Sequence, residues 1–439
     1  MDNKIVEIRT TLQQVFSIDI EEIAQEKEFV QRLSKLTGLK FVEIWVMGFL
    51  EKPSASLNYL VQVAADINVS ITKQGLQDRL SRGAVDFLLA VLKRCTIQLR
   101  NKLPMDLSLL KKFSGLQIVD SSAFGLPDNL QNEFPGSGGA GPKSALKLQV
   151  IWDFLHGNFL DIVTQDGNQP DQSFCQHALQ ILPGWLCLSD LGYFALETLE
   201  IIVRTQAYFI SRWSVGCGLI DPATETKFDL LSYLQKTTQN QLELNLWIGL
   251  QKRIACRLLA VRLSPEIVEE RRRKLREKAR KKGRAVSAVS LAWLEWSIFI
   301  TNVPLEWLTL EQISLIYRLR WQIELLFKLW KSECQIDRIA GRIRDRVLCE
   351  IYAKLIGSVI FQYISFPLRW TDRELSPVKA IQTFRRFAVA LANALQNAEK
   401  LDALLSKLFD VWRRCGLKDK HHIQLTTCQR IALVGQILA

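Results

Sequence analysis

Two apolar runs in this sequence end in an aspartate: residues 116–119 are followed by Asp120, and residues 184–189 by Asp190. A carboxylate at the end of a buried strand is held rigidly at the edge of a sheet. Two such acids on neighbouring strands could share a hard divalent cation, which prefers oxygen ligands. The alternative is that each aspartate only starts a turn, as aspartates at strand ends often do. The pattern by itself leaves both interpretations open.

A third acid, Glu324, lies in a segment with helical spacing, YRLRWQIELLFKLWK. Together with Tyr317, Arg320 and Lys331 it lies within roughly 60° of one helical face, at about 100° per residue. The alternative is a surface stripe of ion pairs. Such a stripe seldom has one acid flanked by cations on an otherwise very apolar helix. Four apolar side chains are expected to dock this helix on the protein: Ile323, Leu326, Phe327 and Trp330.

These residues resemble the signature of a known family, the DDE transposases of bacterial insertion sequences marked by Tyr-x2-Arg-x3-Glu-x6-Lys. Every signature position is matched. The contexts IVDSSAF and LSDLGYF around the two aspartates, and ITNVP ahead of the helix, also look like those of the family. The resemblance covers about residues 70–365.

The resemblance implies a role for each matched residue. Asp120, Asp190 and Glu324 would bind two Mg²⁺ or Mn²⁺ ions for phosphoryl transfer. The other signature residues, Tyr317, Arg320 and Lys331, would grip phosphates of the DNA. Some relatives also stack a flipped base on a tryptophan ahead of this helix. For the two tryptophans in that region, Trp293 and Trp296, we expect core packing instead.

The elements that must position these residues begin with a helical region at 1–112, predicted to be a DNA-binding domain. Its segment VSITKQGLQDRLS resembles the turn and second helix of a helix-turn-helix, with Lys73, Gln74, Gln77 and Arg79 available to DNA. An ordinary helical hairpin with a polar outer face explains the segment equally well.

The rest of the chain mixes strands and helices, which predicts an α/β class. The resemblance implies an RNase H-like core, with its first part at 113–213 and its last part, carrying the signature helix, at 304–365. Between them, 214–303 is predicted to be a β-rich insertion, and 366–439 a helical C-terminal region. The insertion contains a basic helix at 266–284, with ten basic and four acidic residues. This helix is either a solvated charged face or a DNA-phosphate contact through residues such as Arg271, Arg272 and Lys274.

Composition agrees with a nucleic-acid partner. Lys and Arg total 57 against 45 acidic residues, a formal charge of +12, which favours a polyanionic partner, either nucleic acid or an anionic membrane surface. The nine cysteines form no CxxC pair and the chain has four histidines, which argues against a disulfide framework or a zinc site. The apolar stretch 351–366 carries Lys354 and is short for a membrane span, so we expect a buried helix.

The sequence therefore predicts a cytoplasmic, nucleoid-associated transposase with no membrane contact. It would cut double-stranded DNA at the terminal repeats of an insertion sequence and join the ends to target DNA, as a dimer assembled on DNA. Two alternatives stay open: a metal-dependent nuclease of the same fold that does not join, and a catalytically inactive DNA-binding protein derived from a transposase.

Overall fold

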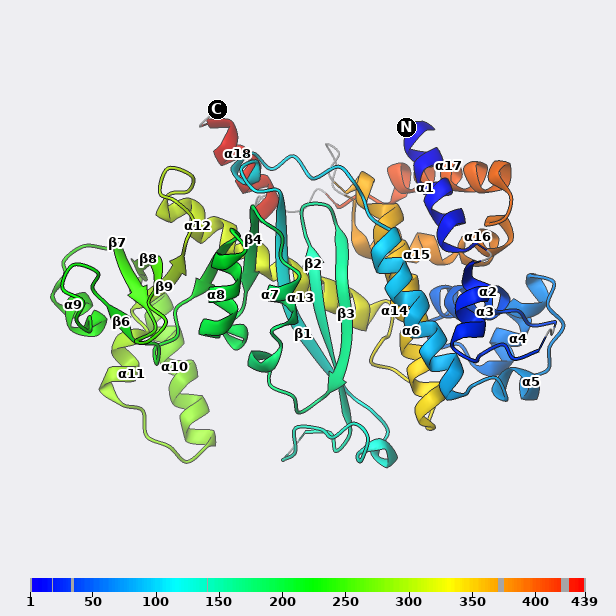
Figure 1. Cartoon of the computed structure of the whole chain (residues 1–439), viewed down its shortest axis with the longest axis horizontal. Helices are drawn as coiled ribbons and strands as arrows, with labels where there is room; N and C mark the ends of the chain where they lie inside the picture. Colours follow the sequence, from blue (N-terminus) through cyan, green and yellow to red (C-terminus); the bar gives the residue numbers. More distant parts are fainter. Residues whose placement is uncertain are drawn as a thin grey trace. The chain divides into compact units, whose positions relative to one another are not determined.

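The chain divides into two compact units in the computed structural model (Figure 1). The structure describes residues 2–17, 19–32, 35–139, 141–369, 375–419 and 426–437. Unit 1 comprises Met1–Met105, Asp120–Gln169 and Gln322–Leu425, and unit 2 comprises Asp106–Val119, Pro170–Trp321 and Thr426–Ala439. Parts of the predicted C-terminal helical region, 370–374 and 420–425, lie outside the described residues.

One nine-stranded sheet has the strand order β3-β2-β1-β4-β5-β9-β8-β7-β6. β1 pairs with β4 and β4 with β5 in parallel, whereas β2 and β3 are antiparallel. The order 3-2-1-4-5 with this mixture of directions is the RNase H-like arrangement, so the predicted α/β fold class is confirmed. These core strands are β1 Gly115–Gly125, β2 Ala145–Asp153, β3 Asn158–Asp166, β4 Trp185–Ser189 and β5 Tyr208–Arg212.

The predicted β-rich insertion continues this same sheet. β9 pairs antiparallel with β5, β8 with β9, β7 with β8 and β6 with β7. The strands and the basic helix expected between residues 214 and 303 are therefore present. They are β6 Leu219–Ile220, α9 Leu230–Lys236, β7 Gln241–Ile248, β8 Ile254–Arg262, α10 Pro265–Lys281, α11 Ala288–Trp293 and β9 Trp296–Thr301.

In unit 1 the core is built around α14 (Arg344–Ser365), which is buried from Val347 to its end and packs against α3, α6 and β3. A helix that is apolar all round belongs in a protein core or a membrane. The segment Arg344–Leu368 is the one helix among the described residues that is long and apolar enough to span a membrane, and its apolar window is wholly buried in the fold. The expected buried helix at 351–366 is confirmed.

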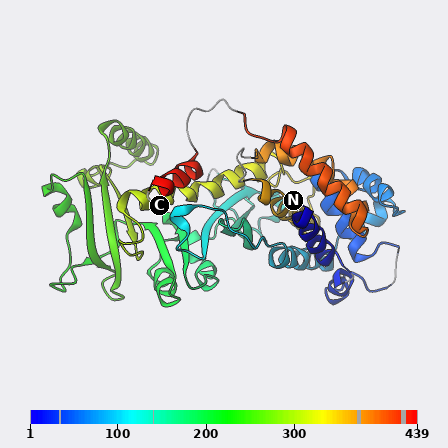
Figure 2. The same cartoon turned by 90° about the horizontal axis from the view of Figure 1, so that it is seen from above.

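The other helices of unit 1 come from both ends of the chain. Figure 2 shows α1 alongside α17. An ion pair at 3.0 Å joins Arg9 of α1 to Asp402 of α17. These helices are α1 Asp2–Val15, α2 Asp19–Glu26, α3 Gly38–Glu51, α4 Leu57–Asp66, α5 Lys73–Gln77, α6 Arg82–Gln98, α13 Trp321–Ser332, α15 Pro377–Arg385, α16 Ala388–Ala394 and α17 Ala398–Cys415.

Unit 2 surrounds its strands with short helices and carries the C-terminal helix. The main ones are η1 Ser108–Leu110, α7 Gln176–Leu179, η4 Leu191–Tyr193, α8 Leu196–Arg204, α12 Leu310–Tyr317, the 3₁₀ turn η5 Arg318–Arg320 and α18 Thr427–Ile437. α18 packs against η1, α12 and η5.

The segment compared with a helix-turn-helix contains only the five-residue helix α5 between α4 and α6. Thr72 caps the start of α5, and Ser81 caps the start of α6 four residues after α5 ends. Two N-caps this close together do not allow a long second helix. Lys73 and Gln77 are both exposed on this short turn.

Candidate active site

Asp120 and Asp190 follow the last paired residues of two parallel strands. The register of β1 and β4 ends with Val119 opposite Ser189, and each aspartate is the next residue. Because neighbouring strands lie about 4.8 Å apart, this register carries both acids to the same end of the strand pair. Asp190 ends β4 as expected, but Asp120 does not end its strand: β1 continues to Gly125, where it neighbours β2.

Both carboxylates are half-buried. The Ser121 backbone N–H donates to the Asp120 carboxylate at 2.8 Å, which fixes the direction of that side chain. Both apolar runs are thus strands of the core, and their pairing with each other ends just before the acids. Asp190 also starts the 3₁₀ turn η4, so the turn interpretation stays open for this residue.

Tyr317 is buried at the end of β4. Its hydroxyl donates to the carbonyl of Ser189, the residue before Asp190, at 3.2 Å. Burial raises the pKa of Tyr317 to about 12, opposed by the charge of Arg320 and assisted by that of Asp190. The phenol is therefore neutral at ordinary pH, and it positions the strand end that carries Asp190.

The signature segment is not one continuous α-helix. A 3₁₀ turn, η5, separates α12 from α13. Because side chains three residues apart eclipse each other in a 3₁₀ helix, Tyr317 and Arg320 stand directly in line. This agrees with the hydrogen bond from Arg320 that lowers the pKa of the phenol. The predicted common face therefore consists of two parts, Tyr317 with Arg320, and Glu324 with Lys331 on α13.

In unit 1, α13 is docked by the apolar side chains that the sequence predicted. Ile323, Leu326, Phe327 and Trp330 are all buried, and the Trp330 ring lies 5.5 Å from that of Phe159 on β3. On the other face, the Lys331 ammonium donates to the carbonyl of Ala123 at 3.2 Å. Ala123 is three residues after Asp120 on β1, so Lys331 lies beside the strand that carries the first acid. Glu324 is half-buried on this helix.

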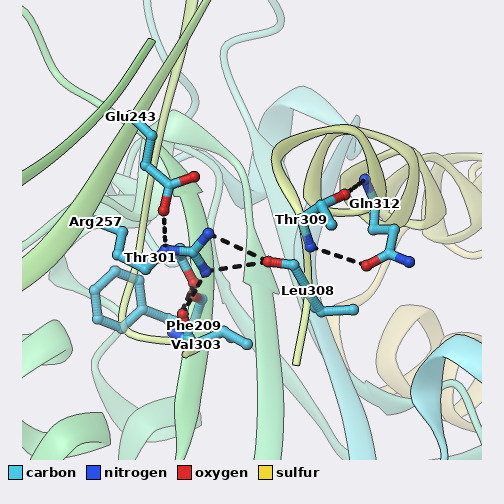
Figure 3. A network of polar contacts seen from close by, with 8 residues as sticks. All are labelled: Phe209, Glu243, Arg257, Thr301, Val303, Leu308, Thr309 and Gln312. Carbon is cyan, nitrogen blue, oxygen red and sulfur yellow. Dashed lines mark hydrogen bonds and ion pairs between the residues drawn. The ribbon is translucent and has the colours of Figure 1, made fainter. Parts of the chain in front are cut away.

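Arg257, on β8 of the insertion, fixes the chain that leads into α12 (Figure 3). Its guanidinium, 8% exposed, donates to the carbonyls of Val303 at 2.6 Å and Leu308 at 3.2 Å. It also forms an ion pair with Glu243 at 2.7 Å. α12 then begins with a capping box formed by Thr309 and Gln312. The insertion thus positions the helix that carries Tyr317.

The motif ITNVP has a structural explanation in the same network. The Thr301 hydroxyl donates to the carbonyl of Phe209 at 2.6 Å and accepts from the Val303 N–H at 3.0 Å. The Asn302 amide accepts from the Phe209 N–H and donates to the Ala207 carbonyl, both at 2.8 Å. These side chains tie the end of β9 to β5.

Within unit 2, a pocket of about 110 Å³ is lined in part by Leu191, the residue after Asp190. The Trp213 and Trp293 rings lie 5.2 Å apart, and Trp296, 5% exposed, carries the Arg262 guanidinium over its ring at 4.8 Å. Burial lowers the pKa of Arg271, and the nearby charge of Arg212 lowers it further. The lining residues are Leu191, Arg212, Trp213, Val215, Arg271, Trp293, Trp296, Ser297 and Ile298.

Core packing accounts for Trp296, as expected, but Trp293 is half-exposed at this pocket. Sequence reasoning missed Arg212 and Trp213. They end the segment AYFISRW, where a cation and an aromatic residue follow a strand, and this is the signal that could have found them.

Several cations of the basic helix α10 form ion pairs within the protein. Arg272 pairs with Glu269 at 2.9 Å and with Glu295 at 2.8 Å, and Lys274 pairs with Glu270 at 2.6 Å. Other cations of this helix are exposed: Arg276, Lys278, Arg280 and Lys281. Both interpretations of the helix thus find support, because ion pairs occupy one set of charges and solvent surrounds another.

Asp120, Asp190 and Glu324 are the candidate ligands for a divalent ion. Carboxylate oxygens are the ligands that Mg²⁺ and Mn²⁺ prefer, and the β1–β4 register brings Asp120 and Asp190 to one strand edge. Over the described parts of the chain, no three Asp, Glu, His or Cys side chains form a ready group around one position. Asp120 and Asp190 thus suit a divalent ion by residue type and by strand placement, whereas the described residues do not bring a third acid to them.

This chain is similar to known transposases. A family model described as "Transposase DDE domain" matches residues 111–360. The transposase for insertion sequence element IS231E of Bacillus thuringiensis subsp. finitimus is 30% identical over 94% of this chain and 92% of its own length. The transposase for IS1151 of Clostridium perfringens is 26% identical over 99% of this chain and 98% of its own.

A solved structure also resembles the fold. It is described as a piggyBac transposase synaptic complex with hairpin DNA, and it matches 96% of this chain and 87% of its own chain with a TM-score of 0.51 at 7% identity. The two insertion-sequence relatives and the solved structure each match more than nine-tenths of this chain, whereas the family model matches residues 111–360. Strand order, the two strand-end acids and the family match lead to one conclusion: this chain belongs to the DDE transposase family, the metal-dependent enzymes that cut and join DNA.

Proposed function

We propose that Asp120, Asp190 and Glu324 together hold two Mg²⁺ or Mn²⁺ ions at the transposase active site. The observation that carries this proposal is the parallel register that ends with Val119 opposite Ser189, one residue before each aspartate. When bound, divalent ions supply Lewis-acid stabilisation of the attacking and leaving oxygens. The chain's own part is to hold the aspartates on a rigid sheet and to bring Glu324 to them on α13.

Arg320 and Lys331 bind the phosphates on either side of the cut. Arg320 offers a planar fork and Lys331 a point charge, and both suit a phosphodiester. Tyr317 supports this grip by holding Arg320 and the end of β4, and its own contact with phosphate is part of the same proposal.

The test replaces each acid in turn. Asp120→Ala, Asp190→Ala and Glu324→Ala should each abolish nicking of end-containing DNA in Mg²⁺ while leaving DNA binding near wild type. Asp410→Ala, which changes an exposed acid on α17, is the matched control. Wild-type nicking by any one of the three variants would remove that residue from the ligand set.

A joining assay with pre-cleaved ends then tests the first alternative. A nuclease that does not join leaves such ends unchanged, whereas a transposase inserts them into target DNA. Metal-dependent nicking by the wild-type protein excludes the catalytically inactive alternative.

End recognition is proposed to lie in the helices before residue 112, with Lys73 and Gln77 on α5 as contacts. Deletion of residues 1–112 is not a clean test, because α3 and α6 pack against α14 in unit 1. Lys73→Ala combined with Gln77→Ala should weaken binding to terminal repeats more than binding to unrelated DNA. Equal loss for both DNAs would move recognition elsewhere.

The basic helix α10 adds sequence-independent affinity for DNA. Arg271 lies at the Trp213–Trp293 pocket and binds the phosphate of an unpaired base instead. Since Arg272 and Lys274 are held in ion pairs, the exposed cations of α10 are the stronger phosphate contacts. The assembly on DNA is a dimer, and the protein acts in the cytoplasm at the nucleoid.

The pocket itself suits an unpaired base. Trp213 and Trp293 offer stacking faces, and Arg212 and Arg271 offer charge for its phosphate. The test uses DNA with the fluorescent base 2-aminopurine at the first position flanking the transposon end. The wild-type protein should change the fluorescence of this base by unstacking it, and Trp293→Ala should abolish that change. An unchanged signal would assign this pocket to packing.

A further inference from the structure

An arginine-rich loop follows α13 in unit 1. Residues 335–346, QIDRIAGRIRDR, contain four arginines and two aspartates and are named here the arginine loop. α13 ends at Ser332 and α14 begins at Arg344, so most of this segment is neither helix nor strand. A loop without regular backbone bonds must be held by other contacts if it is to keep one conformation.

A buried ion pair on α14 holds the first half of the arginine loop. The Lys354 ammonium and the Glu350 carboxylate lie 2.8 Å apart, with side chains only 1% and 2% exposed. Lys354 also donates to the carbonyls of Gln335 at 3.0 Å and Arg338 at 2.7 Å. Glu350 accepts from the N–H of Ala340 at 3.2 Å. Each charge of the pair thus anchors loop backbone.

A buried ion pair is weak evidence for stability, because desolvation offsets its attraction. The pair does hold the backbone that it binds in one conformation. Here it fixes both sides of the turn around Arg338.

The second half of the loop rests on the connection between β1 and β2. The Asn129 amide donates to the carbonyl of Arg342 at 2.9 Å. Arg344 pairs with Glu133 at 2.7 Å and with Asp345 at 2.9 Å. The charge of Arg344 is therefore used within the protein.

The remaining cations point to solvent. Arg338 and Arg342 are exposed and Arg346 is half-exposed. Among the described residues, no acid lies within ion-pair distance of these three guanidinium groups. The remaining acid of the loop, Asp337, is half-buried, and one of its carboxylate oxygens is fully buried. A rigid backbone that displays free guanidinium groups is suited to phosphates.

We propose that Arg338 and Arg342 bind phosphates of the DNA that this transposase cuts, away from the cut itself, and that Glu350 and Lys354 are positioning residues for them. From Glu324 to Ser332, α13 covers about 12 Å at 1.5 Å per residue. That length equals about four base pairs of B-DNA at 3.4 Å each. The proposal rests on the transposase function but not on the metal-ligand assignment.

The decisive experiment measures how salt affects binding of the full-length protein to an end-containing duplex. Arg338→Gln combined with Arg342→Gln should flatten the slope of log Kobs against log salt by about 1.8, since each phosphate contact contributes about 0.9. The control is Lys400→Gln combined with Lys407→Gln, which removes two exposed cations from α17. The control slope should stay at the wild-type value.

Duplexes trimmed to about three base pairs on either side of the cut form a second arm. On such short DNA the arginine variant and the wild type should bind alike. An unchanged slope on long DNA, or equal flattening in the control, overturns the proposal. Failure of the wild type to cut at all would count against the function instead, so the two failures are distinguishable.

The positioning role has its own variant, Glu350→Leu combined with Lys354→Met. Replacing both charges with apolar side chains of similar volume keeps a buried pair site folded and often stabilises it. We expect a folded protein with a lower melting temperature, because backbone groups of Gln335, Arg338 and Ala340 lose their partners, together with the flattened salt slope of the arginine variant. A folded double variant with wild-type slope and wild-type cleavage would show that the pair has no positioning role.

Discussion

Tyr317 shows how a single signature residue combines structure with function. Its ring packs against Phe299 at 5.1 Å, its hydroxyl holds the Ser189 carbonyl, and Arg320 lies in line with it. A pKa of about 12 means that the phenol does not ionise at the pH where DNA is handled. A neutral donor thereby holds the backbone of Ser189, the residue before Asp190.

Lys331 allows phosphate binding to be separated from stability. Its ammonium makes one surface hydrogen bond, to the Ala123 carbonyl, so Lys331→Ala should lower unfolding free energy by about 1 kcal/mol at most. Cleavage should fall by a factor of ten or more, because a charge-assisted phosphate contact is worth about 1.5 to 3 kcal/mol. Melting temperature and nicking rate are measured on the same sample. A destabilised variant with full activity would mean that Lys331 only fastens α13 to β1.

At the scale of elements, the insertion supports the signature segment through Arg257. Arg257→Lys keeps the charge but loses the fork that reaches Val303, Leu308 and Glu243 together. We expect a loss of about 1.5 to 3 kcal/mol in unfolding free energy, because the broken hydrogen bonds involve a charged donor. Nicking should fall as well, because α12 loses its fixed starting point.

Arg204→Lys is the matched control for Arg257→Lys. Arg204 forms an exposed ion pair with Glu200 one turn away, so its replacement should change neither the free energy of unfolding nor the nicking rate. If Arg257→Lys is destabilised but cuts DNA at the control rate, the insertion does not act on the site through this network.

For α10, the exposed and the paired cations should behave differently. Neutralising Arg276, Lys278 and Lys281 to Gln should weaken binding to all DNA alike and flatten the salt slope by up to about 2.7. Arg272→Gln should mainly lower the melting temperature, because Arg272 links Glu269 to Glu295. A steep, wild-type slope in the triple variant would identify α10 as a solvated face.

Local sequence patterns predicted many of these elements. Strands of the insertion, the apolar docking face of α13 and the buried helix around Lys354 all follow from residue periodicity. The acids at Asp120 and Asp190 were visible as apolar runs ending in a charge. The sequence did not predict that β1 continues past Asp120. That continuation depends on pairing with β2, which has no local signal in the sequence.

Other features depend on contacts between distant segments. The helices before residue 105 pack on α14, some 250 residues later, so their separate-domain appearance in the sequence is not reproduced by the compact units. The 3₁₀ turn at Arg318–Arg320 interrupts a sequence whose helical spacing is unbroken. Arg257, Glu350 and Lys354 are charged residues in otherwise apolar runs. Their partners are mostly backbone groups, which no sequence pattern specifies.

At the scale of the whole molecule, pH should act on stability through His177. This imidazole is 1% exposed, and burial lowers its pKa to about 4. The unfolded chain, with an ordinary histidine pKa near 6.5, binds the proton more readily. Unfolding free energy should therefore fall as pH drops below about 6.5, with a total loss of about 3 kcal/mol reached near pH 4.

The measurement is urea unfolding from pH 7.5 to 4.5 for the wild type and for His177→Phe. Phenylalanine keeps the ring packing against Phe174 and Tyr193 but cannot take up a proton. The free energy of unfolding of the wild type should fall more than that of His177→Phe as the pH drops. Carboxylates titrate equally in both proteins, so the extra loss in the wild type comes from His177. Parallel curves would show that His177 is not the group responsible.

The antiparallel pairing of β5 with β9 has a consequence for how the protein is made. β5 ends at Arg212 and β9 begins at Trp296, which is 84 positions later by subtraction. A ribosome working at about 5 to 20 residues per second delivers β9 roughly 4 to 17 s after β5. Throughout that delay the N–H and C=O groups on one edge of β5 have no strand to bind, and such an edge is where nascent chains associate with one another. Nascent chains stalled before residue 296 should therefore aggregate, and slower production or a chaperone that covers strand edges should raise the yield of active transposase.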